Sequence, residues 1–257
     1  MTPRRPGAAL LALALAALLL AACGGAGGQT YSWGWYVISP FTPQGRTNLG
    51  FLVEGFGATI AISLIAIVCS VVLGAAVSLA AFAPGRALRA FNRGYVELFR
   101  AVPILVMVLW VYYGLPALLG VQFGIFVSGI IALALSDSAF EAEVFRAGIQ
   151  SVEKGQVEAA KSVGLSRWQA MRFVVLPQAI RRVLPALGNQ FVYMLKMSSL
   201  LSVIGFQELT RRANELTVTE YRPLEIYTFL VAEYLALILV ASWLVRRLET
   251  SLGQTHR

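Results

Sequence analysis

Long apolar stretches, separated by short basic or mixed-charge segments, dominate this sequence. No charged residue occurs from position 55 to 85, or from 101 to 136. A membrane-spanning helix needs about 20 apolar residues, so the first stretch suits one span. The second, which is interrupted by Gly and Pro, suits two spans joined by a tight turn. The pattern therefore predicts five spans, at about 55–85, 103–119, 123–143, 183–205 and 226–245.

A shorter apolar run at residues 7–22 precedes these spans. It follows Arg4 and Arg5 and ends Leu20-Ala21-Ala22-Cys23 before a Gly-rich stretch. This is typical of a signal peptide, and its end resembles a bacterial lipobox with Cys23 as the lipidated residue. An uncleaved span with a chance cysteine is the alternative. We assign residues 1–23 to this signal-like segment, 24–50 to an external loop rich in Trp and Tyr, and 251–257 to a tail.

The composition supports an integral membrane protein. Hydrophobic residues make up 58% of the chain and charged residues 13%, about half the roughly 25% that is usual in soluble domains. This excludes a disordered chain and argues against a soluble globular domain. Cys23 and Cys69 form no disulfide framework or zinc site. The one histidine, His256, excludes a histidine-based metal centre, so we expect no metal site and no catalytic residues.

The basic residues predict the orientation of the chain. With an N-terminus inside before signal removal, 16 of the 21 Lys and Arg residues fall on the cytoplasmic side and four on the outer side. This split follows the positive-inside rule, whereas the reverse topology violates it. After signal removal the mature N-terminus lies outside and the C-terminus in the cytoplasm. The net charge of +8 then reflects the flanks of the spans and needs no nucleic acid as a partner.

The cytoplasmic segment at about 146–182 is the least hydrophobic long stretch on the inner side. Residues 156–163 suit a short helix, and Gly164 suits its C′ position, where φ is often positive. Ser166 suits the N-cap of a second helix, with Gln169 completing a capping box. Pro177 ends this helix or opens the next. We therefore predict two short helices at a tight Gly corner. Such an element can insert into a groove on a partner, although an amphipathic interfacial loop is the alternative.

This segment resembles the EAA loop of bacterial ABC importer permeases. The matching positions are Glu158-Ala159-Ala160, Gly164 with Leu165 after it, Val174 and Leu176-Pro177. Residues 100–103, 142–149 and 195–205 are also similar to the branch that carries histidine, glutamine, arginine and cystine. The similarity spans about residues 53–247, so residues 51–250 are assigned to a permease transmembrane domain. The fold expected is an all-α membrane protein with five core helices of the ABC importer permease type.

The resemblance implies a set of partners in the bacterial inner membrane. They are an ABC ATPase dimer, a second permease subunit of the same or another chain, an external solute-binding protein, a polar amino acid and membrane lipid. The EAA loop would contact the ATPase. Independently, the chain has no G-x-x-x-x-G-K-[ST] phosphate loop. We therefore expect no cofactor on this chain, no enzymatic activity of its own, and ATP hydrolysis in the separate subunit.

Several polar residues lie within the predicted spans, where a charge is costly and usually faces a partner or a watery cavity. Glu143 and Arg146, spaced i,i+3, suit a structural pair near the inner interface. Asp137 either lines a pathway or pairs with Lys196. The polar groups of the fourth span bind a zwitterionic substrate or form hydrogen bonds between helices. The candidates for the substrate path or an intramembrane pair are Asp137, Glu143, Asn189, Lys196, Ser198 and Ser199.

Two further questions stay open at the level of sequence. The mixed-charge segment around Arg211 and Arg212 is either an interfacial helix or a docking or gating surface for a binding protein. A stand-alone channel or secondary transporter for small polar solutes is the alternative to the permease. It would need coupling residues inside the membrane and would have no use for the loop from Glu158 to Pro177.

Overall fold

The computed structural model describes residues 31–251, so the predictions for residues 1–23, Cys23 among them, and for the end of the tail lie outside the described residues. The chain divides after Gly34 into two units. In the first, the rings of Tyr31 and Trp33 pack edge to face, with centroids 5.4 Å apart. The second, from Trp35 onward, holds every described helix, and no strand occurs among the described residues.

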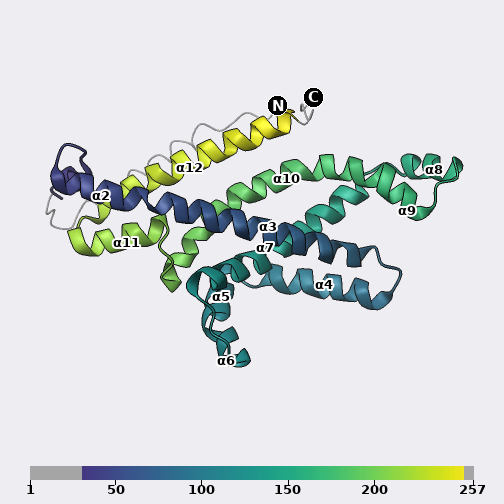
Figure 1. Cartoon of the computed structure of the whole chain (residues 1–257), viewed down its shortest axis with the longest axis horizontal. Helices are drawn as coiled ribbons and strands as arrows, with labels where there is room; N and C mark the ends of the chain where they lie inside the picture. The colour runs from purple at the N-terminus through teal and green to yellow at the C-terminus, as the bar shows by residue number, and fades with distance from the viewer. Residues whose placement is uncertain (1–30, 252–257) are drawn as a thin grey trace, which may run out of the picture. The chain divides into compact units, whose positions relative to one another are not determined.

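The helices of this second unit follow one another with short connections (Figure 1). In chain order they are η1 (Trp35–Ile38), α2 (Pro43–Val53), α3 (Gly55–Ala81), α4 (Arg86–Ala101), α5 (Ile104–Leu109), η2 (Trp110–Gly114), α6 (Leu115–Leu119), α7 (Ile125–Gln150), α8 (Lys154–Ser162), α9 (Arg167–Ala170), η3 (Met171–Val175), α10 (Leu176–Met197), η4 (Ser198–Ile204), α11 (Leu209–Glu220) and α12 (Pro223–Ser251). The prediction of an all-α membrane protein is confirmed.

Within residues 31–251, three helical segments are long and apolar enough to cross a membrane: Pro43–Ala81, Ile125–Gln150 and Pro223–Ser251. A fourth crossing arises if the pair Arg86–Ala101 and Ile104–Leu119, bent by 99°, counts as one broken span. The bend lies at Pro103, which lacks an N–H and forces Val102 into extended backbone (φ −82°, ψ 124°). Five spans therefore remain a prediction. The α10 helix, in the region of the predicted fourth span, carries too many polar residues to count as long and apolar enough to cross a membrane.

The core lies where α3, α5, α7, α10 and η4 meet. Its most buried side chains are Ile62, Val108, Leu133, Met194 and Leu201. The α3 and α7 helices pack against each other along much of their length. Close packing of small residues is how helices associate in a membrane, since lipid tails are as apolar as leucine side chains.

Two π-helical segments each precede a Leu-Pro pair. In η2 the amide of Leu115 bonds to the carbonyl of Trp110, and in η3 the amide of Leu176 bonds to that of Met171. A proline inside a helix removes one amide donor and clashes with the carbonyl of residue i−4. The wider π turn accommodates Pro116 and Pro177 without ending the helix. Pro177 therefore stands at the start of α10 in a continuous helical path, which resolves the two alternatives from the sequence in favour of opening.

The structure differs from the sequence prediction in two places. Part of the segment assigned to an external loop at 24–50 is helical, with η1 followed by α2, whose N-cap Thr42 accepts a hydrogen bond from the Gly45 amide. The basic segment after the first span, for which no element was predicted, is helix α4. In both places short apolar repeats are interspersed with polar residues, so no long hydrophobic run marks the helix.

Candidate functional site

The cytoplasmic segment forms two short helices, α8 and α9, at a tight corner at Gly164, as predicted. Gly164 has φ +84°, its amide bonds to the Lys161 carbonyl at 2.9 Å, and the Leu165 amide bonds to the Ala160 carbonyl at 3.1 Å. These two bonds are those of a Schellman motif, which ends α8 by satisfying its last carbonyls. A side chain at Gly164 would be strained, because left-handed backbone disfavours residues with a Cβ.

The second helix of the corner begins with a complete capping box. The Ser166 hydroxyl accepts a hydrogen bond from the Gln169 amide at 3.3 Å, and the Gln169 side chain accepts one from the Ser166 amide at 2.8 Å. These bonds satisfy amide donors that the start of a helix leaves without partners. The corner is thus fixed by its own backbone on both sides of Gly164.

An apolar cluster attaches this corner to the rest of the protein. Its buried members are Val152, Val175 and Ala179, which link the connection after α7 to η3 and α10. The Arg182 guanidinium also bonds to the Ser151 carbonyl and, at 3.0 Å, to its hydroxyl. A cavity of about 570 Å³, lined mainly by apolar side chains, lies beneath α8. The corner is therefore supported from one side.

The opposite side of the corner is open. Glu158 and Ala159 are exposed, whereas Ala160 is buried, so the two alanines have different surroundings. Trp168 and Val163 are 73% and 77% exposed. Leu165 and Leu176 are half-buried and Pro177 is exposed. A set of apolar side chains this exposed, rimmed by polar residues, is typical of an interaction surface.

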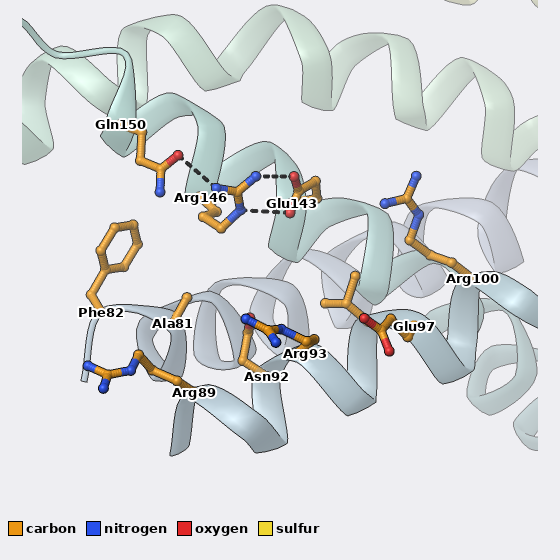
Figure 2. A pocket seen from close by; sticks show the side chains of 11 residues that line it. Ala81, Phe82, Arg89, Asn92, Arg93, Glu97, Arg100, Glu143, Arg146 and Gln150 are labelled. Carbon is orange, nitrogen blue, oxygen red and sulfur yellow. Dashed lines mark hydrogen bonds and ion pairs between the residues drawn. The ribbon is translucent and has the colours of Figure 1, made fainter. Parts of the chain in front are cut away.

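Glu143 and Arg146 form the predicted ion pair. The Arg146 Nε lies 2.8 Å from Glu143 Oε2, a second nitrogen contacts the other oxygen, and a third nitrogen donates to Gln150 Oε1 at 2.7 Å (Figure 2). This two-pronged geometry is the strong arrangement for arginine and carboxylate. The Arg146 side chain is thereby held on the surface of α7.

Asp137 does not pair with Lys196, contrary to one of the two alternatives from the sequence. Its carboxylate is buried and accepts hydrogen bonds from the Ser70 hydroxyl of α3 and the Gln190 amide of α10. Three helices thus meet at one carboxylate. One turn further along α7, both carboxylate oxygens of Glu141 are buried with no hydrogen-bond partner among the described residues. The sequence signal for Ser70 was available, because Ser63 and Ser70 are seven residues apart on one helix face.

The remaining candidates lie elsewhere. Asn189 and Lys196 are exposed, and the Lys196 Nζ lies 6.0 Å from the centre of the Tyr193 ring. The hydroxyls of Ser198 and Ser199, at the start of η4, donate to carbonyls three residues back at the end of α10. Lys196 and Ser199 line an open cavity of about 350 Å³ against α12. The candidates for a substrate path or an intramembrane pair therefore do not form one site. Asp137 is buried between helices, whereas Lys196 is exposed.

The mixed-charge segment after Gly205 forms helix α11, and its charged side chains make contacts that hold the helix in place. Glu208 is the N-cap of α11: its carboxylate accepts from the amides of Thr210 and Arg211 at 2.9 and 2.8 Å and from the Tyr234 hydroxyl at 2.9 Å. Burial raises the pKa of this carboxyl more than the hydrogen bonds lower it. This cap could not be predicted from the sequence, because glutamate is not among the preferred N-cap residues.

Arg212 joins α11 to the first span. Its guanidinium donates to Glu54 Oε2 at 2.8 Å and to the Phe51 carbonyl at 2.9 Å, and lies 4.8 Å from the centre of the Phe51 ring. Arg211, by contrast, forms a surface pair with Glu215 at 2.7 Å. Two neighbouring arginines thus have different roles, one between helices and one within a helix.

Comparison with known proteins covers most of the chain. The family described as "Binding-protein-dependent transport system inner membrane component" matches residues 70–254. The glutamine transport system permease protein GlnP of Escherichia coli K12 is 35% identical over 216 residues, which cover 84% of this chain and 95% of that protein. The probable glutamine ABC transporter permease protein GlnM of Bacillus subtilis 168 is 39% identical over 81% of this chain and 96% of its own length.

Solved structures agree with this. A crystal structure of an amino acid ABC transporter with histidines is 34% identical and has a TM-score of 0.79, covering 86% of this chain and 100% of that chain. The MetNI methionine ABC transporter, at 19% identity, 80% and 98% coverage and a TM-score of 0.69, supports the fold alone. The chain therefore belongs to the family of binding-protein-dependent transport system inner membrane components, as a permease subunit of an ABC importer.

Proposed function

We propose that this permease carries polar amino acids into the cell, driven by a separate ATPase dimer. The names of its relatives, which are glutamine permeases at 35% and 39% identity, support a substrate with a polar side chain. The proposal includes a second permease subunit, an external solute-binding protein, a mature N-terminus outside and a C-terminus in the cytoplasm. ATP would bind to the partner subunit and not to this chain.

The corner between α8 and α9 carries the proposal. It is stiffened by a Schellman motif and a capping box, is attached on one side by the cluster of Val152, Val175 and Ala179, and exposes Glu158, Ala159 and Trp168 on the other. A rigid, exposed element of this kind docks into a partner at low entropic cost, because little ordering remains to be done on binding. A stand-alone channel would have no use for it.

Alanine substitutions at two glycines of the same loop test the proposal. Gly164→Ala forces a side chain into left-handed backbone, at a cost of about 1–2 kcal/mol, whereas an alanine at Gly155 meets nothing within 4 Å. The full chain is recovered from native membranes in mild detergent, with and without cross-linking. We expect Gly164→Ala and Glu158→Ala to reduce recovery of a P-loop ATPase, with normal membrane insertion, and Gly155→Ala to leave it unchanged.

The same pull-down separates the alternatives. Roughly equal recovery of an ATPase with the unmodified chain supports the importer, and a different permease beside it would show a heterodimer. Recovery of the chain alone after cross-linking would overturn the coupling role of the corner. Uptake of glutamine by cells that retain the chain but lack the ATPase would favour the stand-alone transporter.

A further inference from the structure

A basic cavity lies between α4 and α7, apart from the corner at Gly164. Its volume is about 460 Å³. Figure 2 shows Arg89, Arg93 and Arg100 of α4 along one wall, with Glu143 and Arg146 of α7 along the other. The helical spacing of the three α4 arginines places them on one face, since residues three, four and seven apart are neighbours on a helix.

The charges that line this cavity are not balanced. Four guanidinium groups face it, against the carboxylates of Glu97 and Glu143, and Glu143 is already bound by Arg146. Among the described residues Arg93 has no hydrogen-bond or ion-pair partner. The Arg89 side chain donates to the Ala83 carbonyl at 3.2 Å, and the Arg100 guanidinium lies 5.1 Å from the centre of the Phe140 ring. Both keep further donors for an anion, because a guanidinium has five N–H groups.

The geometry of guanidinium groups points to a phosphate. Arginine binds phosphate oxygens through two parallel N–H donors, and a cavity between helices lined by several arginines is the arrangement that binds anionic headgroups. A phosphate here would contact Arg93 and neighbouring arginines without displacing the pair of Glu143 and Arg146.

The source of the phosphate follows from another edge of α4. Leu88, Phe91 and Leu98 are each more than half exposed and lie away from the arginines. The α4 helix packs against α3 and α7, so its exposed apolar side faces the surroundings of the protein and not its core. An exposed apolar side beside a basic cavity is what a helix in contact with lipid presents, and a lipid headgroup is therefore the anion at hand.

We propose that the cavity between α4 and α7 binds the headgroup phosphate of an anionic phospholipid. The placement of this lipid in the cytoplasmic leaflet rests on the orientation proposed above. The binding itself does not depend on the ATPase or on the substrate.

Lipid retention by the full chain tests this proposal. The purified protein is incubated in detergent with equal amounts of phosphatidylglycerol and phosphatidylcholine, and bound lipids are counted by native mass spectrometry. We expect phosphatidylglycerol to be preferred, and Arg93→Gln to weaken its binding by about tenfold, because hydrogen bonds to charged groups are among the stronger ones. Arg86→Gln is the control, since Arg86 lies on the same helix but does not line the cavity.

The conservative variant Arg93→Lys keeps the charge and should retain more phosphatidylglycerol than Arg93→Gln. This difference would show that the loss in Arg93→Gln is not caused by misfolding. Equal loss in Arg86→Gln and Arg93→Gln, or no preference over phosphatidylcholine, would overturn the proposal. Displacement of the lipid by millimolar inorganic phosphate would show a site for free phosphate instead. These readouts need no transport, so failure here is distinct from failure of the ATPase pull-down.

Discussion

Replacing Gly74 by alanine places a methyl group where α3 and α7 leave no room for one. A Cβ at this position would lie 2.5 Å from the Glu141 Cβ and 2.9 Å from both the Ala142 nitrogen and the Ser138 carbonyl oxygen. Real Cβ atoms do not approach other atoms this closely. The neighbours are backbone and Cβ atoms, which cannot rotate away as a side-chain end can. The two helices must therefore separate locally.

The expected cost of Gly74→Ala is about 1–3 kcal/mol, the usual range for overpacking a well-packed interior. For a chain of this size each kcal/mol lowers the melting temperature by about 2–4 °C, so a fall of roughly 2–12 °C is expected. Thermal unfolding of the detergent-solubilised protein measures it. The control is Gly57→Ala in the same helix, where a Cβ meets nothing within 4 Å.

The control variant should be as stable as the original chain or slightly more, because alanine favours helix over glycine by up to about 1 kcal/mol. If Gly74→Ala melts at or above the temperature of Gly57→Ala, α3 and α7 do not pack in the way described. A fall in both variants would instead indicate a general intolerance of substitution in α3.

Three further measurements test the polar contacts by thermal unfolding. Arg212→Ala should lower the free energy of unfolding by about 1–3 kcal/mol, because it removes charged hydrogen bonds between helices. Arg211→Ala should change it by about 0.5 kcal/mol or less. Equal effects of the two variants would contradict the different roles given to these arginines. Asp137→Ala should lower the free energy of unfolding by about 1–3 kcal/mol, since it leaves a buried hydroxyl and an amide without an acceptor. Asp137→Asn should lower it less. A larger loss in Asp137→Asn than in Asp137→Ala would show that Asp137 does not join the three helices. The raised pKa of Glu208 means that the folded state holds this proton at pH values where the unfolded chain has lost it. Stability relative to Glu208→Gln should therefore fall as pH rises above the usual carboxyl value of about 4.3; a constant difference between pH 4 and 7 would show an ordinary pKa.

The elements fixed by local chemistry were predictable from the sequence. The charge-free stretches became α3, α5 to α6 and α7, because a helix satisfies all the backbone hydrogen bonds of a long apolar run within the run itself. The corner at Gly164 was equally accessible, since a positive φ, an N-cap serine and a capping box each depend on a few adjacent residues. Functional roles for the corner came from the family resemblance and not from this geometry.

The features that depend on tertiary structure were not predictable. The partners of Asp137 come from α3 and α10, at sequence separations of 67 and 53 residues, and no pattern along the chain connects them. The α4 helix was not predicted, because its arginines indicated only that this segment lies on the cytoplasmic side of a span. The number of spans could not be determined from the sequence for a related reason. The α10 helix lies in the core because of its packing contacts, whereas its own sequence is too polar to mark it as a span.

The placement of α10 gives it a mechanical property. Its 22 residues make a rod of about 33 Å at 1.5 Å per residue. Ala179, near one end, belongs to the cluster that holds the α8–α9 corner, and Met194, near the other, belongs to the core with α3 and α7. A tilt of only about 5° about the core end would move the corner by roughly 3 Å over this length. A small tilt of α10 at the core would therefore produce a larger displacement at the exposed corner.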